Sequence, residues 1–273
     1  MPETVKNMAE KKATSEDQDR INLVLHLADN SLIMGHRLSE WAGHGPMLEQ
    51  DIAITNIALD LIGQSRNFYQ YAAAIITEKN IAGDKVSEDT LAYLRDARDF
   101  KNLLITEIPN GDWGKTILKL FFFSAYQYFL YQKLMSSPDS QIAAISEKSL
   151  KEVTYHLRWS SEWVVRLGDG TNESKKRMKE ATDATWPYTG EMFEPAIYED
   201  KYIAAQTNSD QDNLKNDWDN KVKEVFHEAT LPLPEKGSTW MQKGGKTGMH
   251  TEHLGYILAE MQFLQRAYPG CDW

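Results

Sequence analysis

The sequence has a single cysteine, Cys271, so a disulfide within the chain is excluded. One thiol in 273 residues is typical of a reducing compartment, and we expect a cytoplasmic protein. Cys271 lies near the end of the chain without an obvious base beside it, so we do not expect it to act as a nucleophile.

The sequence also lacks an apolar run long enough to cross a bilayer, and its first 19 residues lack the apolar segment of a signal peptide. Basic residues are fewer than acidic ones, with 30 Lys and Arg against 40 Asp and Glu, which gives a formal net charge of −10. Because nucleic acids and anionic membranes bind cationic surfaces, we expect neither as a partner.

Strand patterns are almost absent, and residues 201–205 form the one short candidate. From Ile21 onward, apolar residues recur at helical spacing between glycine and proline breaks. This pattern predicts an all-α fold, a bundle of long antiparallel helices with extra C-terminal helices, in a single domain over residues 20–273. Residues 1–19, which have no apolar period, are predicted to be a disordered tail. The predicted helices cover residues 21–41, 48–76, 87–108, 112–135, 139–167, 173–184, 212–229 and 252–268.

The predicted helix 112–135 contains eight aromatic residues. A helix that is apolar on most of its circumference is buried on more than one side. We interpret this helix as core or as a subunit interface, because aromatic residues are enriched at both. In the interface hypothesis, Tyr126, Tyr128 and Tyr131 contact a partner chain.

Long helical bundles often hold two metal ions, bound by a Glu from each of two helices and a Glu-x-x-His motif from each of two others. Among the seven histidines, only His227 has an acid three residues earlier, Glu224. Glu152 and His156 are four residues apart and could bind a metal, but we favour a buried hydrogen-bonded pair. The two complete motifs that a di-metal site needs are missing.

Two other groups of polar residues have helical spacing. His36, Glu40 and His44 form a row at the end of the first predicted helix, where capping and ion pairing are the usual roles. Asp60 and Gln64 lie on one side of the second helix, and glutamine is a poor ligand for iron. Neither group predicts a metal site by itself.

Several long stretches of the chain, in order over about residues 20–273, resemble the C subunits of bacterial phenylacetyl-CoA epoxidases, the ring 1,2-monooxygenases. The stretches are GHRLSEWAGHGPMLEQDIAITNIALDLIGQSRNF at 35–68, RDARDFKNLL at 95–104, PNGDWGKTI at 109–117, YHLRWSSEWVVRLGDGT at 155–171 and GGKTGMHTEHLGYILAEMQFLQRAYPGCDW at 244–273.

The resemblance implies a ferritin-like fold and a place in a multicomponent oxygenase of aerobic phenylacetate degradation. In that family, the A subunit holds a di-iron site and binds phenylacetyl-CoA, which is converted to its ring 1,2-epoxide. The C subunit is a homologue that pairs with A and lacks a working di-iron centre. The other components are a small B subunit and a reductase that passes electrons from NADPH through FAD and an iron–sulfur cluster. The resemblance therefore implies a non-catalytic, structural subunit without a cofactor of its own.

The same resemblance implies which residues occupy the vestigial metal-site positions. Leu61 and Gln64 occupy the positions of the Glu and the His in the Glu-x-x-His motif on the second helix of the catalytic homologue. Val153 and His156 occupy the corresponding positions of its second Glu-x-x-His motif. Glu40 is the candidate on the first helix.

A slip of one residue in this placement would put Asp60 or Glu152 in a ligand slot. Neither placement restores two complete motifs. Because the lost carboxylates supplied both ligands and negative charge, we expect no tight metal binding by this chain.

A loop with charged, aromatic and amide side chains is a second candidate site. Asp99, Phe100, Lys101 and Asn102 follow one another within one of the family-like stretches. We favour a helix end that satisfies its own backbone groups. The alternative is that these residues lie near a vestigial acyl-CoA pocket.

Two functional hypotheses from different classes remain. The first is the structural partner subunit, which could also form a homodimer when alone. The second is an independent di-metal carboxylate oxidase or metal-storage protein that uses Glu40, Glu152, His156 and perhaps Glu224 with His227. The iron content of the purified chain distinguishes them, and the first is the prediction.

Overall fold

The computed structural model describes residues 14–82, 86–200, 210–234 and 240–271. These residues form helices, turns and loops, with no strand among them, so the predicted all-α fold is confirmed. The candidate strand at 201–205 lies outside the described residues. No helix in the described ranges is both long enough and apolar enough to cross a bilayer.

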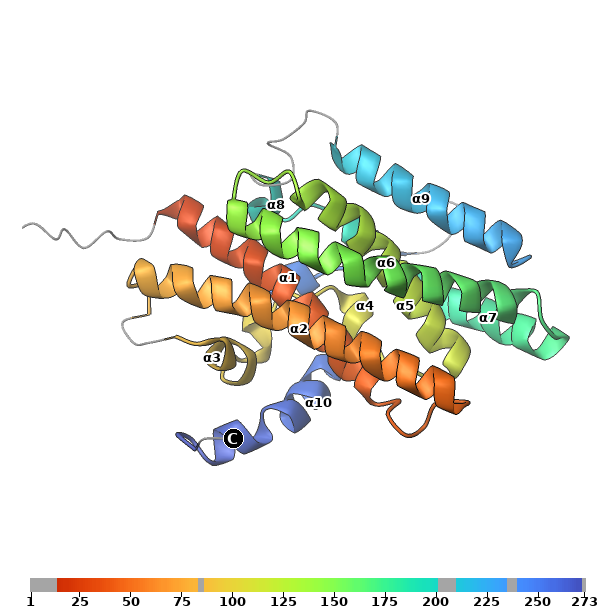
Figure 1. Cartoon of the computed structure of the whole chain (residues 1–273), viewed down its shortest axis with the longest axis horizontal. Coiled ribbons are helices and arrows are strands. Elements are labelled where there is room, and N and C mark those ends of the chain that lie inside the picture. Colours follow the sequence, from red (N-terminus) through yellow and green to blue (C-terminus); the bar gives the residue numbers. More distant parts are fainter. Residues whose placement is uncertain (1–13, 83–85, 201–209, 235–239, 272–273) are drawn as a thin grey trace, which may run out of the picture.

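Four long helices build a bundle of the ferritin-like kind (Figure 1). They are α1 (Ser15–Ser39), α2 (Leu48–Glu78), α5 (Trp113–Leu134) and α6 (Ser140–Gly168). Helix α1 packs mainly on α2, α5 packs mainly on α6, and α2 also contacts α6. The loops within each pair are short, so paired helices run antiparallel. The buried apolar residues of all four helices belong to one continuous core.

The C-terminal third adds smaller helices to the outside of this bundle (Figure 1). Helices α7 (Asn172–Thr185) and α9 (Asp210–Glu228) cover α5 and α6, and α8 (Ile197–Asp200) contacts α1. Helices α10 (Glu252–Met261) and α11 (Phe263–Ala267) form an arm that begins beside the short helix α4 (Leu104–Glu107). The extra helices predicted after the bundle are therefore confirmed.

The prediction of a disordered tail over residues 1–19 is wrong at its C-terminal end. Helix α1 begins at Ser15, because the hydroxyl of Thr14 accepts the backbone N–H of Asp17 while the Asp17 carboxylate accepts the N–H of Thr14. This reciprocal capping box satisfies two backbone donors that would otherwise be free at a helix start. Residues 1–13 lie outside the described residues.

The predicted helix 87–108 is also wrong, because the chain there forms three short pieces. These are α3 (Glu88–Tyr93), the 3₁₀ turn η1 (Ala97–Asp99) and α4. Between η1 and α4, backbone N–H groups bind distant side chains instead of helix carbonyls. The N–H of Lys101 donates to Asp29 and that of Leu103 to Asn30, and both acceptors belong to α1.

The predicted helix 252–268 is likewise interrupted, at Gln262 between α10 and α11. The Gln262 side-chain amide donates to the carbonyls of Ala92 and Arg95. These two bonds fasten the arm to the end of α3. As in the 87–108 region, a tertiary contact replaces the regular helix that the local pattern predicts.

The aromatic helix α5 is core. Phe121, Phe122 and Phe123 are fully buried, and the Phe122 ring lies against Trp218 of α9 at 5.6 Å between centroids. The side chains of Tyr126 and Tyr131 are 1% exposed. The hypothesis that these two tyrosines contact a partner is therefore wrong, because α6, α7 and α9 of the same chain cover the helix.

Candidate functional site

The centre of the bundle contains a row of hydrogen-bonded side chains that joins all four long helices. Gln127 of α5 donates through Nε2 to Ser31 Oγ of α1 at 3.4 Å and to Tyr131 Oη at 3.3 Å. The Tyr131 hydroxyl donates to Gln64 Oε1 of α2 at 3.5 Å, and Gln64 Nε2 donates to Glu152 Oε2 of α6 at 2.8 Å. We call Ser31, Gln64, Gln127, Tyr131 and Glu152 the central chain.

One helical turn beyond Glu152, a second contact joins α6 to α2. His156 Nε2 lies 3.0 Å from Asp60 Oδ2. The imidazole is fully buried, whereas the Asp60 side chain is 38% exposed. The predicted pairing of Glu152 with His156 is therefore wrong, because each residue binds a side chain of α2 instead.

The remaining vestigial positions divide into apolar core and surface. Leu61 and Val153 are fully buried apolar residues. Glu40 lies just past the end of α1, with its side chain 47% exposed, and binds Arg37 and Asn110. The prediction that Glu40 belongs to the site is wrong, because α1 contributes Ser31 to the centre.

Sequence reasoning missed Ser31 and Gln127 as members of the site. Gln127 gave a signal, since it is a polar residue in the middle of the aromatic helix, where burial is expected. Ser31 gave none, because a small hydroxyl in a helix commonly binds the carbonyl four residues earlier, and Ser31 does bind Leu27 O.

The central residues do not fit a di-iron centre. Such a centre in a ferritin-like bundle needs a Glu from each of two helices, and here α1 and α5 supply a serine and a glutamine. The α6 pair Glu152 and His156 has the wrong spacing for Glu-x-x-His, and α2 supplies Gln64 where a histidine would be needed. Within residues 14–82, 86–200, 210–234 and 240–271, no three His, Cys, Asp or Glu side chains form a group that could hold a metal ion.

The candidate ligands on α9 do not join the centre either. Glu224 and His227 are exposed, and Glu224 forms an ion pair with Lys221 at 2.8 Å. The set that the di-metal hypothesis requires is thus divided between the buried centre, the end of α1 and the surface of α9.

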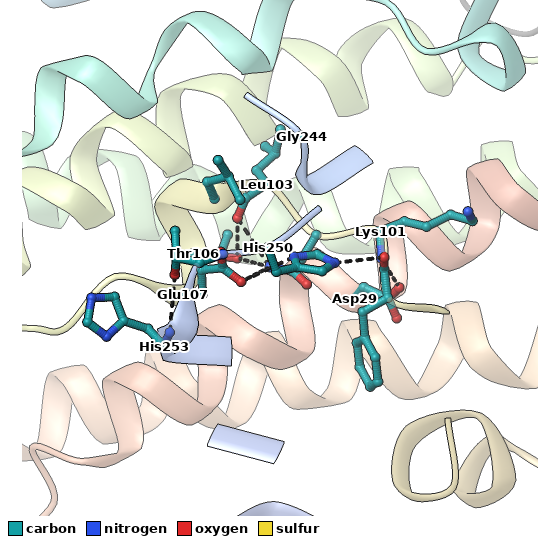
Figure 2. A network of polar contacts seen from close by, with 12 residues as sticks. Asp29, Lys101, Leu103, Thr106, Glu107, Gly244, His250 and His253 are labelled. Atoms are coloured by element: carbon teal, nitrogen blue, oxygen red, sulfur yellow. Dashed lines mark hydrogen bonds and ion pairs between the residues drawn. The ribbon is translucent and has the colours of Figure 1, made fainter. Parts of the chain in front are cut away.

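A second polar cluster surrounds Asp29 of α1, and it is charged. Figure 2 shows Asp29 and its contact with Lys101. The fully buried Asp29 carboxylate forms an ion pair with Arg95 and accepts the Tyr69 hydroxyl. It also accepts the Lys101 N–H at 2.8 Å, while His26 Nδ1 lies 2.7 Å from the Lys101 carbonyl oxygen. We call these five residues the Asp29 cluster, and it fixes the loop that precedes α4.

The loop 99–102, predicted as either a helix end or a substrate-proximal surface, is built into this cluster. Phe100 and Asn102 are fully buried, and the Asn102 amide donates to Thr106 Oγ1 at 3.2 Å. Asp99 is exposed and Lys101 is half-buried. For Phe100 and Asn102 the geometry favours a structural role, and contact with an acyl-CoA stays a prediction for Asp99 and Lys101.

The same network continues to the C-terminal segment through a buried acid and a histidine (Figure 2). Glu107 Oε2 lies 3.2 Å from His250 Nδ1, and Glu107 Oε1 accepts the Thr251 N–H at 2.8 Å. Burial alone would lower the pKa of His250. The hydrogen bond and charge of Glu107, with a bond to the Phe100 carbonyl, outweigh burial and raise that pKa above 6.5.

Comparison with known proteins shows which family the sequence matches. The sequence model of the family described as phenylacetic acid catabolic protein matches residues 4–273. A curated relative, the C subunit of the 1,2-phenylacetyl-CoA epoxidase of Escherichia coli (strain K12), is 45% identical over 249 residues. The match covers 91% of this chain and 97% of that protein.

Proposed function

Because the chain belongs to the phenylacetic acid catabolic protein family, we propose that it is a structural, non-catalytic subunit of a multicomponent phenylacetyl-CoA epoxidase. In this role it pairs with a homologous subunit that holds the di-iron site and stabilises it. The 45% identity to the C subunit of such an epoxidase, over nearly the whole of both chains, supports the assignment.

The central chain is the observation that carries the non-catalytic role. A di-iron centre needs several carboxylates, because they neutralise two cations and supply most of the ligands. Here a hydroxyl and two amides, from Ser31, Gln64 and Gln127, occupy the middle of the bundle. Gln127 binds Ser31 directly and is linked to Gln64 through the Tyr131 hydroxyl. Hydrogen bonds between side chains thus join the four helices where metal–ligand bonds would join them in a metalloprotein.

The partner and cofactor assignments follow from this proposal. The di-iron site belongs to the homologous A subunit, and FAD, an iron–sulfur cluster and NADPH belong to the reductase component. The complex also includes a small B subunit and acts in the cytoplasm. This chain carries out no step of the epoxidation, and it provides the surface against which the catalytic subunit packs.

The experiment that tests the proposal is the metal content of the chain alone and of its complex. The chain and the A subunit are expressed separately and together in iron-supplemented cells, and iron is measured per polypeptide after purification. We expect iron only in preparations that contain the A subunit, and epoxidation of phenylacetyl-CoA only when the other components are added to the complex. Stoichiometric iron in the chain alone would instead support the di-metal oxidase or storage hypothesis.

A further inference from the structure

The outward side of α2 carries apolar side chains that the described chain does not cover. Leu48, Ile52 and Leu59 recur at spacings of four and seven residues, which places them on one face of the helix. Their exposed fractions are 72%, 52% and 60%. We call these three residues the α2 stripe. Apolar side chains aligned on one helix face, rather than scattered singly, mark a surface for another protein.

Gly63 lies one turn beyond Leu59 on the same face, and packing within the chain does not explain it. A Cβ atom added at Gly63 would meet no atom within 4 Å, whereas one added at Gly35 would come 3.2 Å from the Ala58 carbonyl oxygen. Glycine destabilises the interior of a helix relative to alanine. Gly35 is needed for the contact between α1 and α2, and Gly63 fits a close contact with a backbone from outside the chain.

The long outer helices α6 and α9 lack such a surface, whereas the short helices α10 and α11 expose apolar side chains of their own, among them Tyr256 and Phe263. On α9, every exposed residue between positions 213 and 228 is polar or charged. On α6, Tyr155 is the large apolar side chain with substantial exposure, at 38%, and Arg158 lies over its ring. Within the part of the chain that the structure describes, the long helix with an apolar outer row is therefore α2.

Charge decides between a second copy of this chain and a different partner. Acidic side chains flank the stripe, since Glu49 is exposed and Asp60 is 38% exposed. The one cation of α2, Arg66, lies beyond the stripe and already pairs with Glu88. The whole chain carries a net charge of −10, so two copies meeting here would bring acidic surfaces together.

We propose that the α2 stripe is the surface on which a helix of the homologous di-iron subunit packs. Gly63 admits the backbone of that helix, and its basic side chains face Glu49 and Asp60. This inference rests on the proposed function and deepens it by naming the contact. Opposite charge at the rim adds to the rate and specificity of association, while the apolar centre supplies most of the affinity.

The test compares identical substitutions on and off the stripe. Ile52→Arg and Leu59→Arg place a charge on the stripe, and Ile197→Arg places one at an exposed isoleucine of α8, which is 84% exposed. The dissociation constant for the purified A subunit is measured by calorimetry. We expect Ile52→Arg and Leu59→Arg to weaken binding at least ~30-fold, as for a central interface residue, and Ile197→Arg to change it less than about threefold.

Gly63→Ala provides a second readout that a folding defect cannot imitate. The added methyl group meets nothing within the chain and favours the helix, so the isolated protein should melt at a higher temperature. If a partner backbone approaches Gly63, the same variant should bind the A subunit more weakly. A variant that is more stable and binds as tightly as the wild type would contradict the close approach.

The possible outcomes separate this inference from the proposed function. If the wild-type chain does not bind the A subunit, both are overturned. If the wild type binds and Ile52→Arg and Leu59→Arg bind equally well, the stripe is not the contact and the proposed function survives. If Ile52→Arg dissolves a homodimer but leaves A-subunit binding intact, the surface serves a second copy, and the inference is wrong.

Discussion

The bundle buries two polar regions whose bonding differs. In the central chain, the groups are mostly neutral and the bonds that Tyr131 makes with Gln127 and Gln64 are long, at 3.3 and 3.5 Å. In the Asp29 cluster, two opposite charges are buried, and the Lys101 N–H and carbonyl form bonds of 2.8 and 2.7 Å. Glu152 is thus the one carboxylate in the central chain, where a ferritin-like bundle would hold metal, whereas the Asp29 cluster pairs opposite charges where a loop must be fixed.

This difference indicates what each region does. A buried ion pair is costly to break, because removing one partner leaves the other charge without compensation. A neutral amide with weak bonds costs less to replace. We therefore expect substitutions in the Asp29 cluster to have larger effects on stability than substitutions in the central chain, and the four predictions below test that order.

The largest effect is expected for Asp29→Ala. The substitution leaves the Arg95 guanidinium, whose side chain is 12% exposed, without its carboxylate, and leaves the Lys101 N–H without an acceptor. We expect a loss of ~3–5 kcal/mol in the free energy of unfolding, measured by urea denaturation. Asp183→Ala, at an exposed position of α7, is the matched control and should change stability by less than ~0.5 kcal/mol.

The next largest effect is expected for His156→Ala, which tests the edge of the central region. The substitution removes the buried imidazole that bonds Asp60, and Asp60 can then turn to solvent because its side chain is 38% exposed. We expect a loss of ~1–3 kcal/mol in the same urea assay. A loss equal to that of Asp29→Ala would remove the distinction between the two regions.

A smaller, pH-dependent effect is expected at His250, in the extension of the Asp29 cluster. Its pKa in the folded state is raised above the ordinary 6.5, chiefly by Glu107 acting against burial. The stability that this histidine contributes is therefore fully present below pH 6.5 and lost as pH rises through the raised pKa. Urea midpoints of the wild type and His250→Gln should differ more at pH 6 than at pH 9. His227→Gln, at an exposed histidine, should show no such change in the difference.

The smallest effect is expected for Gln127→Leu. The Gln127 Oε1 atom is buried without a hydrogen-bond partner in the described structure, and its Nε2 bonds are long. A leucine removes the unpaired oxygen while Ser31 keeps its bond to Leu27 O. We expect a change of less than ~1 kcal/mol in either direction, measured by thermal and urea unfolding. A loss above this range would mean that the amide is essential to the bundle.

The sequence predicts the long helices well, because their signals are local. Asp112 and Asp139 cap α5 and α6 with bonds to backbone N–H groups two or three residues ahead, and apolar spacing marks the buried faces. The region 87–108 is predicted poorly, because its backbone bonds to Asp29 and Asn30, more than 70 residues away. Such partners leave no trace in a local pattern.

The candidate site is predicted only in part, for a related reason. Gln64 and His156 are placed at the centre because the resemblance preserves their positions within α2 and α6. Glu40 is the carboxylate that the sequence offers at the end of α1, but the packing of α1 against the other helices brings Ser31 to the centre instead. Which residue of α1 lies at the centre of the bundle depends on how the helices pack, and neither residue type nor spacing along α1 reveals this.

The most direct test of the non-catalytic role is the epoxidation rate of an assembled complex that carries Glu152→Gln together with His156→Ala in this chain. These substitutions remove the carboxylate and the imidazole that α6 contributes to the centre. The complex is purified by size, its iron content is confirmed, and phenylacetyl-CoA turnover is measured per A subunit. We predict a rate within about twofold of the wild type, which is small against the losses seen when catalytic groups are removed. Loss of turnover by about 100-fold or more, in a complex that assembles and retains its iron, would contradict a structural role for this chain.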